Sequence, residues 1–288
     1  MRLLAIADLH LGYLANRRAL DGLPACPDDW LIVAGDTGET FDHLERALDA
    51  LTTRFAKVIW TPGNHDLWVR PQAERAEDRL RGEARYAAMV AACRVRGVVT
   101  PEDPWPEWPG PGPQRIVAPL FLLYDYSFRP DHVPAAEAIE WAGEDGILCA
   151  DERYLATDPH PSPVEWCARR TADAEARLSE VPPDTRLIIA NHYPLRADLA
   201  DLWRIPRFSI WCGTRRTDEW HVRFRADVVV YGHLHRRSTR YRDGVRFEEV
   251  SLGYPREWRP ERPLEAYLRE ILPANDPPPV PVDGAPLT

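Results

Sequence analysis

The chain has 288 residues, of which 44% are apolar, which is enough to bury a full-sized core and excludes global disorder. No apolar run approaches the roughly 18–20 residues of a membrane-spanning helix, and Asp8 and His10 interrupt the apolar N-terminus before it can act as a signal peptide, so we expect a cytoplasmic protein. The net charge of −9 disfavours nucleic acid as the main partner, and five dispersed cysteines without a C-x-x-C pair argue against a disulfide framework or a zinc knuckle.

Apolar runs and amphipathic stretches alternate along the N-terminal part of the chain. We predict buried strands over residues 3–7, 31–34 and 57–60, because short apolar runs bounded by polar residues are typical of such strands. Helical spacing of apolar residues predicts helices over 40–55 and 74–94. This alternation indicates a layered α/β domain.

The middle of the chain is different in composition. Residues 101–113 contain six prolines, which excludes a helix interior or a central strand. A strand is predicted over 116–124, whereas 125–163 lacks clear periodicity. We therefore interpret the region of about 101–163 as an insertion that lies over the domain.

The C-terminal part returns to regular patterns. We predict a helix over 163–181, strands over 186–190 and 227–231, and a hairpin of 238–242 and 245–250 that turns at Asp243-Gly244. The last residues are rich in proline. We expect one domain over residues 1–274, followed by a loose tail over 275–288.

Almost every predicted strand is followed by residues of the types that bind metal ions. The clusters are Asp8-Leu9-His10, Gly35-Asp36-Thr37-Gly38-Glu39, Gly63-Asn64-His65-Asp66, Asn191-His192 and Gly232-His233-Leu234-His235. In open α/β sheets, binding sites gather at the carboxyl ends of the strands. We therefore expect these clusters to form a single site.

The chemistry of these donors indicates the kind of site. Carboxylate, amide and imidazole donors without a thiolate suit Mn²⁺, Fe or Zn²⁺ in a centre that keeps bound water. The five clusters together offer at least seven such donors. Seven donors are too many for one such ion, but they fit two ions that share a carboxylate. Two ions about 3.5–4 Å apart promote displacement at a phosphoester and lower the pKa of bound water from ~15.7 toward ~7.

The motifs D-x-H, G-D-x-x-E, G-N-H-D, N-H and G-H-x-H, in this order over residues 8–235, resemble those of the calcineurin-like metallophosphoesterase family. The resemblance implies an α/β fold, a β-sandwich flanked by helices, with a dinuclear centre at the C-terminal ends of the strands. It implies a first ion bound by Asp8, His10, Asp36 and His235, with Asp36 bridging to a second ion bound by Asn64, His192 and His233. It also implies that His65 is a general acid or charge stabiliser that Asp66 orients.

Segments outside the metal motifs resemble a narrower, actinobacterial branch of this family, which includes phosphopantetheinyl hydrolases. These segments are 27–36, 121–128, 211–214 and 244–258. Enzymes of that branch hydrolyse the phosphodiester between 4′-phosphopantetheine and a carrier-protein serine. The resemblance thus implies a holo acyl or peptidyl carrier protein, acidic around its serine, as substrate and partner, and two ions that are Mn²⁺ or an Fe/Mn mixture, with Zn²⁺ as the alternative.

An arginine-rich stretch adjoins the last metal motif. Residues 196–246 contain twelve arginines and six acidic residues in an otherwise acidic chain. Arg236 and Arg237 are candidates for docking an acidic partner, with a solvated surface as the alternative role. Trp211 is a candidate for contact with an apolar part of the substrate, with a place in the core as the alternative.

Other functions remain to be weighed against carrier-protein hydrolysis. A small-molecule phosphatase or a nucleotide phosphodiesterase would use the same centre. A nuclease is disfavoured by the net charge and by the lack of a continuous basic tract. A non-catalytic interaction scaffold is disfavoured because it has no need of seven metal-binding side chains.

Overall fold

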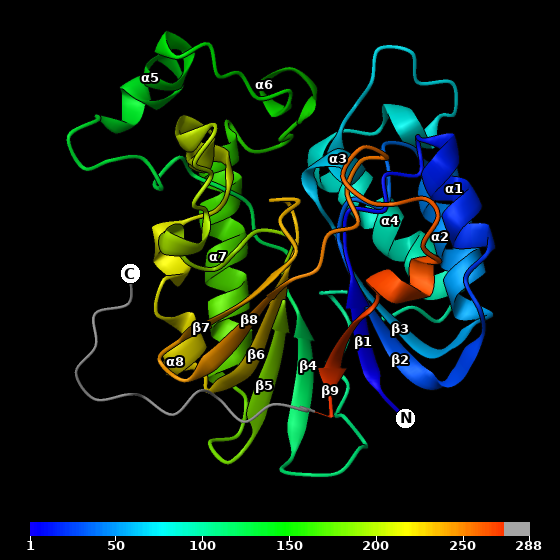
Figure 1. Cartoon of the computed structure of the whole chain (residues 1–288). Coiled ribbons are helices and arrows are strands. Elements are labelled where there is room, and N and C mark those ends of the chain that lie inside the picture. Colours follow the sequence, from blue (N-terminus) through cyan, green and yellow to red (C-terminus); the bar gives the residue numbers. More distant parts are fainter. Residues whose placement is uncertain (274–288) are drawn as a thin grey trace.

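The computed structural model describes residues 1–273, which form four layers, two β-sheets face to face with helices on both outer sides (Figure 1). The predicted tail over 275–288 lies outside the described residues. Within residues 1–273, no helix is long and apolar enough to cross a membrane. The predicted fold class, a β-sandwich flanked by helices, is confirmed.

The first sheet has the strand order β3-β2-β1-β9. β1 (Leu3–Ile6), β2 (Cys26–Ala34) and β3 (Phe55–Thr61) are parallel, and β9 (Arg269–Leu272) pairs antiparallel with β1. β1 is buried along its whole length, which explains its continuous apolar sequence.

The second sheet has the order β4-β5-β6-β8-β7. β4 (Arg115–Pro119), β5 (Arg186–Ala190), β6 (Ala226–Tyr231) and β8 (Val245–Glu249) are parallel, and β7 (Ser238–Arg242) closes the edge as the antiparallel partner of β8. The predicted hairpin is confirmed, and Asp243 and Gly244 both have positive φ at its turn.

The inner faces of the two sheets bury a common apolar core. Ala5 and Ile32 from the first sheet share this core with Ile188 and Val230 from the second. Because alternate side chains of a strand point to opposite faces, the other half of each strand faces the helices.

Helices cover the two outer faces. α1 (Leu14–Asp21), α2 (Phe41–Thr52) and α4 (Gly82–Val95) pack on the first sheet. α7 (Pro163–Ser179) and α8 (Trp220–Arg223) pack on the second, and Ser162 caps α7 by accepting a hydrogen bond from the backbone N–H of Val164.

The structure corrects two predicted elements. The helix predicted over 74–94 begins only at Gly82, because the Asp78 carboxylate accepts a hydrogen bond from the Phe41 N–H (2.7 Å) and holds a short 3₁₀ turn, Glu77–Arg79, in place of a first helical turn. The strand predicted over 116–124 ends at Pro119, because beyond it the backbone N–H of Leu122 donates to the Asn191 side chain and leaves the strand ladder.

The stretch 101–163 is not wholly an insertion, since it contributes β4 to the second sheet. The part of this stretch after β4 includes two short helices, α5 (Ala138–Glu144) and α6 (Asp151–Tyr154), at the end of the molecule toward which the parallel strands run (Figure 1). A very short helix, α3 (Asn64–Leu67), begins directly after β3 at the same end.

Candidate metal centre

The predicted metal-binding residues converge at the carboxyl ends of five strands. They follow β1, β2, β3, β5 and β6, as the sequence analysis predicted. At five of these residues, Asp8, His10, Asp36, His233 and His235, the backbone has φ between 43° and 69°, the left-handed region that non-glycine residues rarely adopt. Such backbone conformations cost energy and persist only where the surrounding fold enforces them, and they cluster at functional sites.

Asp8, His10 and His235 form a first group of donors. The Nε2 atoms of His10 and His235 are 3.2 Å apart, and His235 Nε2 lies 3.0 Å from Asp8 Oδ1. Ligand atoms of these three residues all lie within 4.8 Å of one another. The group therefore can hold one metal ion.

A second group lies around Asp36. His192 Nε2 is 3.5 Å from Asp36 Oδ2 and 3.1 Å from the Asn64 side-chain oxygen. The His192 ring donates through Nδ1 to the Ala34 carbonyl (2.9 Å), which leaves Nε2 free to bind a metal. The His233 ring lies 5.1 Å from that of His192, and its buried Nε2 atom has no hydrogen-bond partner among the described residues.

Asp36 connects the two groups. Its Oδ2 atom lies 4.0 Å from His10 Nε2 on one side and 3.5 Å from His192 Nε2 on the other. This placement fits a bridging carboxylate. Gly63 is required here for close approach, because a Cβ atom at this position would collide with the Asp36 side chain.

The electrostatics of the site fit cations. Burial, together with the charges of Asp8 and Asp66, raises the pKa of Asp36, because the buried carboxylates repel one another. Cations placed between these carboxylates would relieve the repulsion. Burial, together with neighbouring histidines, lowers the pKa of His10 and His233, and burial lowers that of His192. These rings are therefore neutral, which is the form that binds metal ions.

His65 lies at the edge of this centre, with its Nε2 atom 3.9 Å from Asp36 Oδ2. The prediction that Asp66 orients His65 is wrong. The carboxylate of Asp66 instead accepts hydrogen bonds from the backbone N–H groups of Asp36 (2.8 Å) and Gly63 (2.9 Å), and so fixes the metal-binding loop. The carboxylate beside the His65 ring is Glu39, 3.5 Å from Nδ1, and the ring packs on Trp68 at a centroid distance of 3.6 Å.

The sequence analysis missed the residues that hold the predicted metal ligands in place. Asp151, from α6, accepts hydrogen bonds from the Asn64 amide (2.8 Å) and from the Trp68 indole (2.6 Å), so that the Asn64 oxygen points toward His192. Glu257 accepts a hydrogen bond from His235 Nδ1 (2.7 Å). The segment containing Glu257 had a distinctive sequence, but spacing alone gave no reason to place it beside the β6 loop.

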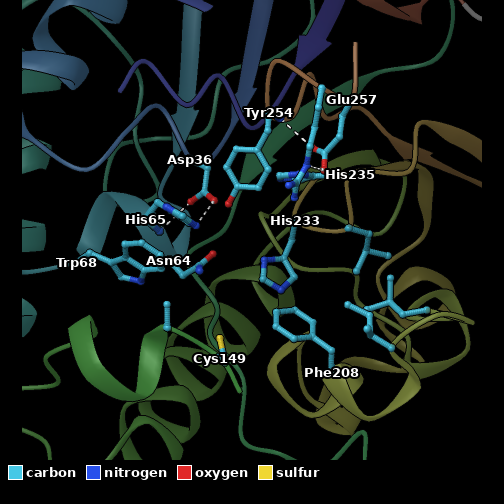
Figure 2. A pocket seen from close by; sticks show the side chains of 15 residues that line it. Asp36, Asn64, His65, Trp68, Cys149, Phe208, His233, His235, Tyr254 and Glu257 are labelled. Atoms are coloured by element: carbon cyan, nitrogen blue, oxygen red, sulfur yellow. Dashed lines mark hydrogen bonds and ion pairs between the residues drawn. The ribbon is translucent and has the colours of Figure 1, made fainter. Parts of the chain in front are cut away.

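A cavity of about 320 Å³ opens beside the metal-binding residues (Figure 2). Asp36, His65 and His233 lie along its polar side, and Tyr254 points into it. The opposite part of the lining is largely apolar and includes Trp68, Leu202, Ile205, Phe208 and Leu234. The cavity thus places an apolar surface next to the polar centre.

The three predicted substrate-binding residues have different locations. Trp211 is fully buried, and its indole N–H donates to Glu152 (2.6 Å), so the prediction that it contacts substrate is wrong and its role is in the core. Arg237 donates to the backbone carbonyls of Val250 (2.9 Å) and Ser251 and lines a different cavity, so its predicted docking role is also wrong. Arg236 is exposed next to the β6 metal loop.

The fold and the site define a metal-dependent phosphoesterase. The calcineurin-like phosphoesterase family model matches residues 1–237, and the chain belongs to this family. Members of this family use a dinuclear centre of divalent metal ions, which the donor set described above fits.

Two comparisons, one of sequence and one of structure, identify a relative with a more specific activity. The chain is 46% identical over 271 residues to the [acyl-carrier-protein] phosphodiesterase PptH of Mycobacterium tuberculosis, and the match covers 93% of this chain and 82% of that protein. The crystal structure of the phosphopantetheinyl hydrolase PptH from Mycobacterium tuberculosis has a TM-score of 0.90 and 45% identity to this chain, and the match covers 95% of this chain and 96% of that one.

Proposed function

We propose that this phosphodiesterase removes 4′-phosphopantetheine from the serine of a holo acyl or peptidyl carrier protein. The observation that carries the proposal is the cavity, in which a metal-binding pole adjoins an apolar wall. A phosphopantetheine arm has a phosphodiester at one end and a long, largely uncharged stem, so it matches both parts. The similarity to an acyl-carrier-protein phosphodiesterase supports the same substrate.

The proposed ligand sets correspond to the two groups of donors. Asp8, His10, Asp36 and His235 would hold the first ion, and Asn64, His192 and His233, with Asp36 shared between the two sites, would hold the second. Nitrogen and oxygen donors without a thiolate favour Mn²⁺ or an Fe/Mn pair, with Zn²⁺ as the alternative. When bound, these ions lower the pKa of water and polarise the phosphoryl oxygens.

The chain's own residues supply the proton and the orientation. His65 faces the cavity and protonates the leaving serine oxygen, while Glu39 and Trp68 hold its ring in place. Asp66 keeps the Asp36 and Gly63 backbone in position and does not itself contact the substrate.

The surroundings of the cavity suit an acidic carrier protein. Arg256 lines the cavity and its side chain is 81% exposed, and Arg236 is exposed on the adjoining loop. Positive charge at this rim attracts the acidic surface around a carrier-protein serine, and the attraction weakens as salt rises. A cytoplasmic location agrees with five free cysteines, which indicate a reducing compartment.

Mass spectrometry of a holo carrier protein incubated with metal-loaded enzyme tests the substrate. We expect the carrier protein to lose its phosphopantetheine and keep an unmodified serine, and Asp36→Asn to abolish this change. Arg236→Glu should lower kcat/KM for the carrier protein about tenfold without affecting a small chromogenic diester, whereas the control Arg223→Glu, on α8, should affect neither.

The alternative within the same chemistry is a small-molecule phosphatase or nucleotide phosphodiesterase. If the carrier protein keeps its full mass while nucleotides or monoesters are hydrolysed rapidly, the carrier-protein substrate is excluded. The assignment to the phosphoesterase family would stand after that result.

A further inference from the structure

The segment from Gly253 to Trp258 lies against the metal centre but has no role in the reaction as described so far. It comes after β8, and the backbone N–H of Gly253 donates to the carbonyl of the metal ligand Asp8 (3.1 Å). Gly253 has φ 88°, which favours glycine at this turn. The segment is therefore attached to the loop that carries the first ligands.

A network of hydrogen bonds, of which those of Asn16 are buried, fixes the shape of this turn. The Asn16 amide, 1% exposed, donates to the carbonyls of Leu9 (2.8 Å) and Gly253 (3.0 Å), and its oxygen accepts from the Trp258 indole (3.2 Å). Glu257 accepts from the Tyr254 N–H (2.9 Å) and from His235 (2.7 Å). Hydrogen bonds thus connect the turn both to the loop after β1, which contains Asp8 and His10, and to the loop after β6, which contains His235.

This turn directs the Tyr254 side chain into the cavity. Its ring stacks on His10 at a centroid distance of 4.5 Å and an angle of 26°, and meets the His235 ring edge-on at 4.9 Å. Figure 2 shows the hydroxyl on the side of the cavity where Asp36, Asn64 and His65 lie. The hydroxyl donates no hydrogen bond to any residue in the described part of the chain. It is therefore a rigidly held hydrogen-bond donor that is free to bind a substrate beside the predicted metal ligands.

We propose that Tyr254 is a catalytic residue that donates a hydrogen bond to a non-bridging phosphoryl oxygen of the substrate. This inference rests on the proposed phosphodiesterase function, but it does not depend on which phosphodiester is hydrolysed. As the phosphorus centre gains a fifth oxygen, negative charge builds on its non-bridging oxygens, and a fixed donor placed there stabilises that charge. No proton is transferred in this step, because the phenol only shares its proton.

Tyr254 and His65 have separate tasks in this arrangement. Both rings contact the ring of His10, at centroid distances of 4.5 and 4.7 Å, so they lie around the same ligand. His65 acts on the leaving oxygen, and its loss should matter less when the leaving group is a good one. Tyr254 acts on the phosphoryl group, so removing its hydroxyl should lower the rate by a similar factor for every leaving group.

The test replaces Tyr254 by Phe, which keeps the ring on His10 and removes only the hydroxyl. We expect kcat to fall about 10²-fold, the effect of removing one such donor, to the same extent for a nitrophenyl diester and for an alkyl diester. Inhibition by orthovanadate, which mimics the five-coordinate phosphorus, should weaken by about the same factor, while elemental analysis still finds the wild-type metal content. Tyr13→Phe is the matched control, because Tyr13 meets the Tyr254 ring edge-on at 5.5 Å but lies 48% exposed and does not line the cavity.

Three results would overturn the inference. Full activity of Tyr254→Phe would show that only the ring matters. Loss of metal from the variant would show that the hydroxyl acts on the centre itself. A loss confined to poor leaving groups would make Tyr254 a proton donor instead. Because the readouts use small diesters and orthovanadate, failure of the carrier-protein hypothesis leaves this test intact.

Discussion

At the scale of single residues, several of the proposed metal ligands are oriented by a group from another part of the chain. Asn64 is held by Asp151, His192 by the Ala34 carbonyl, and His235 by Glu257. Such outer partners fix which atom of a ligand faces the ion. Their removal should weaken metal binding although they never touch the metal.

Asp151 offers the sharpest test of this orienting role. Asp151→Ala removes the acceptor of the Asn64 amide and lets it rotate, so we expect affinity for the second ion to fall about 10–100-fold. Asp151→Asn keeps an oxygen in place, and its affinity should fall much less. Titration calorimetry and elemental analysis measure the effect, with Glu140→Ala, exposed on α5, as control. Two ions bound with unchanged affinity in Asp151→Ala would contradict the role given to Asp151.

The buried carboxylate of Glu249 lies close to the first group of ligands. The Ser251 hydroxyl lies between Asp8 (2.7 Å) and Glu249, yet it has one proton and can donate to only one of them. Burial, reinforced by the charge of Asp8, raises the pKa of Glu249 from 4.5 to about 7. Glu249 therefore carries a proton in the folded, metal-free protein at a pH where the unfolded chain has lost it.

The raised pKa of Glu249 makes the stability of the metal-free protein depend on pH. The stability contributed by the protonated Glu249 is fully present below pH 4.5 and is lost as the pH rises through about 7. With about 1.4 kcal/mol per pKa unit, the loss is up to roughly 3 kcal/mol. In metal-free protein, Glu249→Gln should raise Tm above that of wild type at pH 8 but not at pH 4, measured by calorimetry. Exposed Glu261→Gln should show no such dependence, and an equal Tm change for Glu249→Gln at both pH values would exclude this explanation.

At the scale of elements, the sequence predicted the parts that local patterns determine. The buried strands, the amphipathic helices and the hairpin turn at Asp243-Gly244 have strong local signals, and the metal motifs lie where those strands end. The site could be predicted because parallel strands bring their carboxyl ends to one edge whatever their order in the sheet.

The missed elements depend on distant partners. β9 has only four residues, and its strand conformation comes from pairing with β1, which is far away in the sequence. Residues 120–124 look like a strand but instead hydrogen-bond to the loop after β5, through Asn191. Asp151 and Glu257 reach the centre from segments far from the ligands in sequence, so no local pattern shows their roles.

At the scale of the whole molecule, the two layers of the sandwich meet at the metal centre. Asp8 and Asp36 come from the first sheet, and His192, His233 and His235 come from the second. Ions bound by these proposed ligands would therefore connect the two sheets and neutralise fully buried carboxylates. The metal-free protein should be less stable for both reasons.

Removing the metal should lower Tm by about 5–10 °C, because ions at 100 times their Kd stabilise the fold by about 2.7 kcal/mol each. Differential scanning calorimetry before and after chelation measures the change, and adding Mn²⁺ back should restore it. Asp36→Asn should respond less to chelation than wild type. Elemental analysis must confirm that the metal has been lost. If Tm is then unchanged, the ions contribute nothing to holding the sheets together.

The pairing of β1 with β9 also orders events during synthesis. β1 and Asp8 are made before the groups that complete the Asp8 environment. These groups, His235, Ser251 and Glu257, and the strand β9 that pairs with β1, follow more than 200 residues later. Until these later segments have been made, a nascent chain holds only part of each proposed ligand set and cannot assemble the ion sites. Hydrolytic activity begins only once these late segments have emerged, so shorter products of interrupted synthesis are inactive by construction.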